Sequence, residues 1–278
     1  MGMHILRIMD DMVPRRGDPL ILGQKTETYE IVAGRADAGV IVLCDHATNM
    51  LPDAYGSLGL ETDQLSRHIA YDIGSEGVTR ALASALGAPA IMTKYSRLLI
   101  DPNRGEDDPT LVMRISDGAV VPGNRHLSVE ERQMRISRYY RPYHAAIDDM
   151  IDQCLGVHVT PTLLSIHSFT EVWRRKMRPW HIGILFGQDE RLAQPLLEVL
   201  RKEGDLVVGE NEPYPGQMEG DCMWQHGTGR GVPHAIVELR QDLIASPEGQ
   251  NEWAARLVDV LGRMPATEDL TFTLTEAA

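Results

Sequence analysis

Short apolar runs that alternate with segments of helical periodicity constrain the fold of this chain more than any other feature. The runs lack the alternation of apolar and polar residues that marks a half-exposed strand, so we expect strands that are buried on both faces. Such strands, separated by helices, favour a single α/β domain in which helices cover both faces of a mostly parallel or mixed central sheet. The predicted strands are residues 39–44 (GVIVLC), 97–101 (RLLID), 162–166 (TLLSI), 180–186 (WHIGILF) and 235–239 (AIVEL).

The segments between these strands carry helix start and stop signals. Ser128, followed three residues later by Glu131, forms a capping box at the start of a long helix. Pro142 lacks the N–H that an uninterrupted helix needs, so we expect it to kink or split that helix. The predicted helices are residues 62–86, 128–155, 190–203 and 251–261.

These elements place one α/β domain, expected to be the catalytic one, at residues 39–262. Residues 1–38 show weak periodicity and are expected to form an N-terminal arm or short edge elements, and residues 263–278 are expected to form a C-terminal tail. A chain of 278 residues is long enough to bury a large core in one such domain.

The charge of the chain argues against several classes of partner. The chain has 27 Lys and Arg residues against 40 Asp and Glu residues, which gives a formal net charge of −13, and its basic residues form no extended run. Such a chain repels nucleic acids and anionic membrane surfaces. We expect a cytoplasmic protein, because it has no apolar stretch of about 18 residues for a membrane helix, no secretory signal and only three widely spaced cysteines.

Polar residues lie at or near the points where the predicted strands end. His46 follows the first strand, Arg104 the second and His167 the third, and Glu238 lies near the end of the last. In an open α/β sheet, ligands bind beyond the carboxyl ends of the strands, so we expect these side chains to meet in one site. Two imidazoles and a carboxylate suit a catalytic zinc ion, Glu238 could serve as general base, and an arginine could hold a substrate carboxylate.

Several segments resemble those of known families. Residues 165–169 (SIHSF), 238–240 (ELR) and 103–104 (NR) are similar to segments of the zinc carboxypeptidases that supply a histidine ligand, the glutamate base and a carboxylate-binding arginine. The chain from residue 39 to residue 262 resembles the N-formylglutamate amidohydrolase family more closely. The segments that carry this resemblance, in their expected order, are DHATNMLP, RHIAYDIG, YSRLLIDPNR, PYH, SIHSFT, RPW and VELRQDLI.

This resemblance implies a zinc carboxypeptidase-like fold, of the phosphorylase/hydrolase-like type, and one zinc ion per chain. The implied activity is hydrolysis of N-formyl-L-glutamate to formate and L-glutamate, a step of histidine degradation. Under this hypothesis His46, His167 and an acidic residue bind zinc, Glu238 is the catalytic base, and Asn103 and Arg104 bind the substrate.

The acidic zinc ligand is the departure from the carboxypeptidase pattern. Carboxypeptidases use His-x-x-Glu, whereas here Asn49, a poor zinc ligand, follows His46 at that spacing. Our candidate is Asp72, which would lie with His68 on one face of the predicted helix at i, i+4. Asp45 is the weaker alternative, since neighbouring side chains of an extended segment point to opposite faces, and it could orient a histidine instead.

Two further residues are candidates for binding the substrate. Arg97 begins the predicted strand that Arg104 follows, about 20 Å away along a straight strand. It would therefore reach the site only if the segment bends, and a structural ion pair is its favoured role, with Asp101 as the expected partner of an arginine. His226 lies in a glycine-rich loop (HGTGRG) before the last strand, where it either covers the pocket or is an ordinary loop histidine.

The sequence thus predicts a metal-dependent hydrolase that acts on a small-molecule N-acyl amino acid. Two alternatives stay open: a deacylase or carboxypeptidase-like hydrolase of another small carboxylate-bearing amide, and a non-catalytic binding relative with a decayed metal site. Asn49 keeps the second alternative open, while Glu238 and His167 argue against it, because a binder needs no general base. The loops at 109–124 and 211–230 are expected to govern substrate choice, and the oligomeric state stays open.

Overall fold

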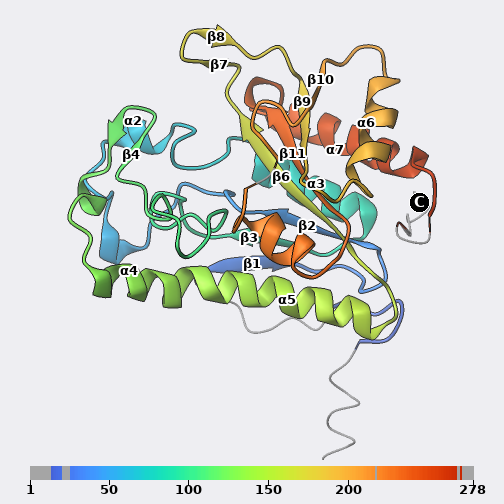
Figure 1. The fold of residues 1–278 in the computed structure, drawn as a ribbon, viewed down its shortest axis with the longest axis horizontal. Helices are drawn as coiled ribbons and strands as arrows, with labels where there is room; N and C mark the ends of the chain where they lie inside the picture. The colour runs from blue at the N-terminus through green and yellow to red at the C-terminus, as the bar shows by residue number, and fades with distance from the viewer. Residues whose placement is uncertain (1–13, 21–25, 217, 268–269, 271–278) are drawn as a thin grey trace, which may run out of the picture.

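A mixed seven-stranded sheet forms the centre of the molecule (Figure 1). The computed structural model describes residues 14–20, 26–216, 218–267 and 270. In spatial order the strands are β1 (Tyr29–Val32), β3 (Ala90–Thr93), β2 (Val40–Cys44), β6 (Thr162–Phe169), β11 (His234–Arg240), β9 (Ile182–Leu185) and β10 (Val208–Glu210). The four strands from β3 to β11 are parallel, whereas β1 and β9 pair antiparallel with β3 and β11. The predicted single α/β domain with a mixed sheet is confirmed.

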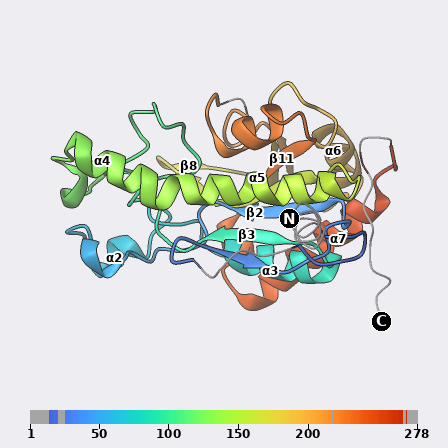
Figure 2. The ribbon, with the colours of Figure 1, turned by 90° about the horizontal axis from the view of Figure 1, so that it is seen from below.

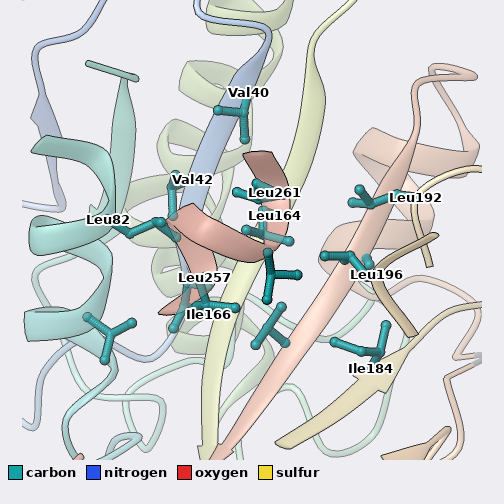
Figure 3. Packing of buried hydrophobic residues seen from close by; sticks show 14 of the residues in the cluster. Val40, Val42, Leu82, Leu164, Ile166, Ile184, Leu192, Leu196, Leu257 and Leu261 are labelled. Carbon is teal, nitrogen blue, oxygen red and sulfur yellow. The ribbon is translucent and has the colours of Figure 1, made fainter. Parts of the chain in front are cut away.

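Helices cover both faces of this sheet, which explains why its inner strands are buried along their length. Successive side chains of a strand point to opposite faces. Val40 and Val42 of β2 therefore join the core under the helices of one face (Figure 3), and Ile41 and Leu43 join the core under the helix of the other. The helices are α3 (Ser75–Leu86), α6 (Ala193–Arg201) and α7 (Pro247–Arg263) on the first face and α5 (Arg141–Gly156) on the second (Figure 2).

Shorter elements connect these layers. Two small hairpins are formed by β4 (Ile115–Ser116) with β5 (Ala119–Val120) and by β7 (Val172–Trp173) with β8 (Lys176–Met177). Single turns of 3₁₀-helix lie at Asp53–Tyr55, Pro122–Asn124 and Gln241–Leu243, and a π-helical turn lies at Trp224–Thr228.

The prediction of a strand at residues 97–101 is wrong, because this apolar run forms buried turns. Leu98, Leu99 and Ile100 are fully buried. The backbone N–H groups of Leu98 and Leu99 donate to the hydroxyl and the carbonyl oxygen of Ser96, at 3.2 and 2.9 Å, instead of to a neighbouring strand. An apolar run reports burial, which a buried turn satisfies as well as a strand does. The strand at this place in the sequence is β3, which was not predicted.

The prediction of one helix over residues 62–86 is wrong in its middle. The chain forms α2 (Thr62–Leu65), then turns, and then α3. Gly74, immediately before α3, has a φ of 84°, and a Cβ there would collide with the backbone of Ile244. His68 and Asp72 therefore do not share a helix face, and Nε2 of His68 lies 3.4 Å from the carboxylate of Asp117 instead.

The long helix that begins at Ser128 is confirmed, together with its interruption. The backbone N–H of Glu131 donates to Oγ of Ser128 at 3.1 Å and caps α4 (Val129–Arg135). A π-helical stretch (Ile136–Tyr140) then leads into α5, whose second residue is Pro142. The missing N–H of Pro142 fits this position, because one hydrogen bond of a regular helix would be lost there.

The remaining predicted strands and helices are present with shifted bounds, and β10 was not predicted. The predicted arm and tail lie partly outside the described residues, and within residues 1–38 the structure has β1 at the edge of the sheet. No helix in the described part of the chain has the length and apolar character needed to span a membrane.

The packing of α7 against the sheet gives a stability prediction. Leu257 of α7 is fully buried in the first core, so Leu257→Ala should lower the free energy of unfolding by about 2–5 kcal/mol. Leu155 of α5 is 40% exposed, and Leu155→Ala should change it by less than about 1 kcal/mol. Denaturant unfolding of both variants measures the difference, and equal effects would contradict this account of the core.

Candidate active site

A cavity of about 220 Å³ lies where the carboxyl ends of β2, β6 and β11 meet. His167 of β6 is the register partner of Glu238 of β11, and His46 follows β2 by two residues. Seven of the eight predicted site residues line this cavity. The lining residues are His46, Asp72, Arg97, Asn103, Arg104, His167, Ser168, Leu185, Tyr214, Pro215, Gly216, Met218, Asp221, Ile236 and Glu238.

Three buried side chains on the wall of the cavity converge on one point. Nδ1 of His46 lies 3.2 Å from Oδ2 of Asp72, and Nδ1 of His167 lies 2.8 Å from the same oxygen. Each residue offers one donor atom, and the three donors lie within 4.8 Å of one another. The set of two imidazoles and one carboxylate could hold a metal ion of the zinc type. Asp72 reaches this point from the turn before α3 and not from a helix.

Carboxylates fix the outer nitrogens of both histidines. Nε2 of His46 lies 2.7 Å from Oδ1 of Asp101, and Nε2 of His167 lies 3.1 Å from Oδ2 of Asp45. A carboxylate only accepts, so both Nε2 atoms donate and both Nδ1 atoms face Asp72. Asp45 thus makes the contact expected of a residue that orients a histidine. Asp101 was expected to fix an arginine, and it contacts both His46 and Arg97.

Contacts between the acidic and histidine side chains of this network shift their pKa values so that the charged forms are favoured. Burial raises the pKa of Asp45, but the hydrogen bond from His167 and the nearby histidine charges outweigh burial and hold this pKa well below its usual range. Burial lowers the pKa of His167, but its bonds to Asp45 and Asp72 outweigh burial and raise this pKa well above its usual range. Tyr143 and Ser165 donate to Asp45 at 2.8 and 2.9 Å and complete its surroundings.

The two arginines of the cavity differ in their partners. Arg97 forms ion pairs with Asp72 and Asp101, each at 3.1 Å, so it has the structural ion pair that its sequence position favoured. Arg97 also lines the cavity. The chain between Arg97 and Arg104 forms turns, so the distance of about 20 Å expected for a straight strand does not apply. Arg104 donates to the carbonyl oxygen of Asn103 at 2.8 Å and has no acidic partner within 4.0 Å among the described residues. Its charge is available to a ligand.

Glu238 has the properties of a general base. It is 6% exposed, and its Oε2 has no hydrogen-bond partner in the described structure. Burial, assisted by the negative charge of Asp72 and opposed by His167, raises the pKa of Glu238 to about 7. A carboxylate with such a pKa can take up and release a proton near neutral pH.

His226, the eighth predicted site residue, does not line this cavity. It is buried against His144, with its Nε2 2.7 Å from Nδ1 of His144. The outer nitrogens of the pair contact the carbonyl oxygen of Pro102 and the carboxylate of Asp148, each at 3.1 Å. With Cys222 the two histidines form a second group of three possible donors in the described residues. The prediction that His226 covers the pocket and binds substrate is not supported by this position.

Sequence reasoning missed two titratable residues that line the cavity. Tyr214 and Asp221 come from the loop at 211–230, which was expected to govern substrate choice without any residue being singled out. Burial raises the pKa of Asp221 to about 6. The sequence held no local signal for either residue, because no predicted strand or motif lies next to them.

The chain is similar to known proteins in both sequence and fold. It matches the family model for N-formylglutamate amidohydrolase over residues 38–245. A gene product of Agrobacterium tumefaciens of known crystal structure shares 30% identity over 86% of this chain and 94% of its own, with a TM-score of 0.81. The crystal structure of N-formylglutamate amidohydrolase from Ralstonia eutropha JMP134 shares 20% identity, covering 86% and 99% of the two chains, with a TM-score of 0.62. No curated protein matches the sequence.

The buried histidine pair next to the cavity gives a prediction for stability in acid. Burial, together with the charge of His226, lowers the pKa of His144 to about 3. Between pH 6.5 and 3 the unfolded chain therefore binds a proton at His144 that the folded chain does not, and the free energy of unfolding falls as the pH falls. In His144→Gln this fall should be shallower, by up to about 1.4 kcal/mol per pH unit.

Denaturant unfolding at several pH values between 7 and 4 measures this slope. His126 is exposed, and His126→Gln should keep the slope of the unchanged protein. An identical slope in His144→Gln would show that His144 is not held neutral by the fold.

Proposed function

The chain belongs to the N-formylglutamate amidohydrolase family and is an amidohydrolase, and we propose that it uses a bound zinc ion and Glu238 to hydrolyse the amide of an N-acyl amino acid. The substrate we propose is N-formyl-L-glutamate, with formate and L-glutamate as products. The cavity of about 220 Å³ suits a molecule of this size, since pockets for drug-sized ligands measure roughly 300–1,000 Å³.

The observation that carries the proposal is the unpartnered oxygen of Glu238. A buried carboxylate oxygen without a hydrogen bond costs folding free energy, so such an atom in a cavity points to a partner that comes with the ligand. Glu238 shares its cavity with His46, Asp72 and His167. A base beside a metal-ligand set is the arrangement of zinc hydrolases.

The donor chemistry of the three residues fits zinc. Each of the two histidines has carboxylate oxygens near both of its nitrogens, and both Nδ1 atoms face the same oxygen of Asp72. Zinc would share the three donors without requiring both imidazoles to be doubly protonated. Asp101 and Asp45 would act as the carboxylate partners that metal-binding histidines commonly have.

The chemistry can be derived from the residues of the chain. Zinc, when bound, supplies a Lewis acid that polarises the amide carbonyl and lowers the pKa of water. Glu238 takes the proton of the attacking water, and the same carboxyl group then passes this proton to the nitrogen of the departing amine. Burial of Glu238 suits both transfers, because it brings the pKa of this group to about 7.

Arg104 and Asn103 would hold the substrate under this proposal. Arg104 lines the cavity and has no acidic partner in the described structure, so its guanidinium can bind a carboxylate of the amino-acid part in bidentate fashion. Asn103 is held by the N–H of Cys222, which donates to its Oδ1 at 3.1 Å. A carboxylate fixed at Arg104 restricts where the amide carbonyl can lie, which favours attack.

Glu238→Gln tests the role of the base. Glutamine has nearly the same shape but cannot accept the proton of water, so formate release from N-formyl-L-glutamate should fall by about 10²–10⁴-fold. The matched control is Glu210→Gln on β10, because Glu210 is exposed and pairs with Arg201 at 2.7 Å. Full activity of Glu238→Gln would contradict the assignment.

Activity of the unchanged protein towards N-acetyl but not N-formyl amino acids would favour the alternative of another deacylase.

Metal content tests the zinc site independently of activity. Elemental analysis of protein purified without a metal column or a histidine tag should give about one zinc per chain. His46→Ala and His167→Ala should each lose the metal, whereas His126→Ala, at an exposed position, should keep it. A folded protein that contains no zinc and takes none up would end the metal-assisted mechanism.

A further inference from the structure

Arg178 is a buried cation that has no acidic partner among the described residues. Arg178 is 7% exposed. It lies in the segment between β8 and β9, near the carboxyl end of β6. Its hydrogen bonds come from Nη1 alone and go to neutral oxygens: the carbonyl and hydroxyl of Thr170, at 3.4 and 3.2 Å, and the hydroxyl of Tyr214, at 3.2 Å. No carboxylate of the described residues lies within 4.0 Å of its guanidinium.

The surroundings of this guanidinium are aromatic. Its central carbon lies 5.0, 5.3 and 5.8 Å from the ring centres of Tyr214, Trp173 and Phe169. Aromatic faces attract a cation but do not neutralise it. A buried positive charge normally has an anionic partner, because removing the charge from water is costly. No such partner of Arg178 is found among the described residues.

Two other arginine side chains with little exposure have such partners. Arg97 pairs with two aspartates at 3.1 Å, and Arg135 pairs with Glu131 at 2.8 Å. Arg178 differs from these two residues because no acidic side chain of the described residues lies beside its guanidinium. The guanidinium of Arg178 is therefore suited to bind an anionic group of a ligand.

Tyr214 connects Arg178 to the active-site cavity. Tyr214 lines the cavity together with Arg104 and Glu238. Its hydroxyl oxygen accepts from Arg178, so its own proton is free to be donated to another acceptor. The hydroxyl keeps this proton at neutral pH, because the ordinary pKa of tyrosine is about 10 and the partial burial of Tyr214, followed by the negative charge of Glu238, raises this pKa further.

We propose that Arg178 and Tyr214 form a subsite for a second carboxylate of the substrate. The inference rests on the proposed function: Arg104 holds one carboxylate of the N-acyl amino acid, and the Arg178–Tyr214 subsite holds the carboxylate of an acidic side chain. The cavity lining includes the carboxylates of Asp72, Asp221 and Glu238, and Arg97 is already paired with Asp72 and Asp101. A second arginine without an acidic partner in the described structure, held next to the cavity by Tyr214, therefore favours the binding of a dianion. The subsite selects substrates with an acidic side chain.

Paired substrates that differ only in this charge test the proposal. The unchanged protein should hydrolyse N-formyl-L-glutamate with a kcat/KM about 100-fold above that for N-formyl-L-glutamine, whose side chain has the same shape without the charge. Arg178→Gln should lose about 100-fold on the glutamate substrate and little on the glutamine substrate. Arg178→Lys should keep part of the preference, and Tyr214→Phe should raise KM for the glutamate substrate.

The matched control is Arg174→Gln. Arg174 lies in the β7–β8 hairpin that immediately precedes Arg178, and its guanidinium carbon lies 5.7 Å from the ring centre of Trp173. Arg174 is exposed, so the preference should be unchanged in this variant. Equal losses of Arg178→Gln on both substrates, or an unchanged preference, would overturn the subsite. If Arg178→Gln does not fold, the same comparison for Tyr214→Phe and Arg178→Lys decides, and an unchanged preference in both overturns it.

Failure of the proposed function would be recognised separately. If the unchanged protein hydrolyses none of these substrates, that function fails, and calorimetric binding of glutarate and of its monoamide decides the subsite. Glutarate should then bind more tightly than the monoamide, and Arg178→Gln should remove the difference. Equal binding of the two compounds to the unchanged protein would overturn the subsite.

Discussion

The carboxylate of Asp72 is the contact on which the active site depends. One of its oxygens faces Nδ1 of both His46 and His167, and the other pairs with Arg97. All of these groups are buried or nearly so, and a buried charge is tolerated only when its partners are in place. The turn before α3, the strand β6 and the turn at residues 97–101 must therefore assemble together, because each contributes one side of this network.

The central sheet supplies the rigidity that this arrangement requires. His167 and Glu238 lie opposite each other on the paired strands β6 and β11, so their separation is set by the backbone hydrogen bonds of the sheet. The two cores hold these strands from both faces. His167 and Glu238 thus stand on the most constrained part of the molecule, whereas Tyr214 and Asp221 come from a loop.

The division between sheet and loop has a consequence for specificity. Under the proposed function, the strand residues His167 and Glu238 take part in the chemistry of amide hydrolysis, and their positions follow from the register of the sheet. Arg178 and Tyr214 lie in connecting segments, which can change without disturbing that register. Members of one family can therefore keep the same reaction and differ in the substrates that they accept.

The sequence by itself determined the α/β class, because strands buried on both faces must be apolar throughout. It also placed His46, His167 and Glu238 at one edge of the sheet, since the carboxyl ends of parallel strands meet there. The tertiary structure alone decided that residues 97–101 form a turn and that Asp72 leaves the helix. The apolar pattern of a sequence indicates which residues are buried but not which backbone conformation they adopt. Asp101, the partner of His46, lies 55 residues away along the chain, so no local sequence spacing could predict this contact.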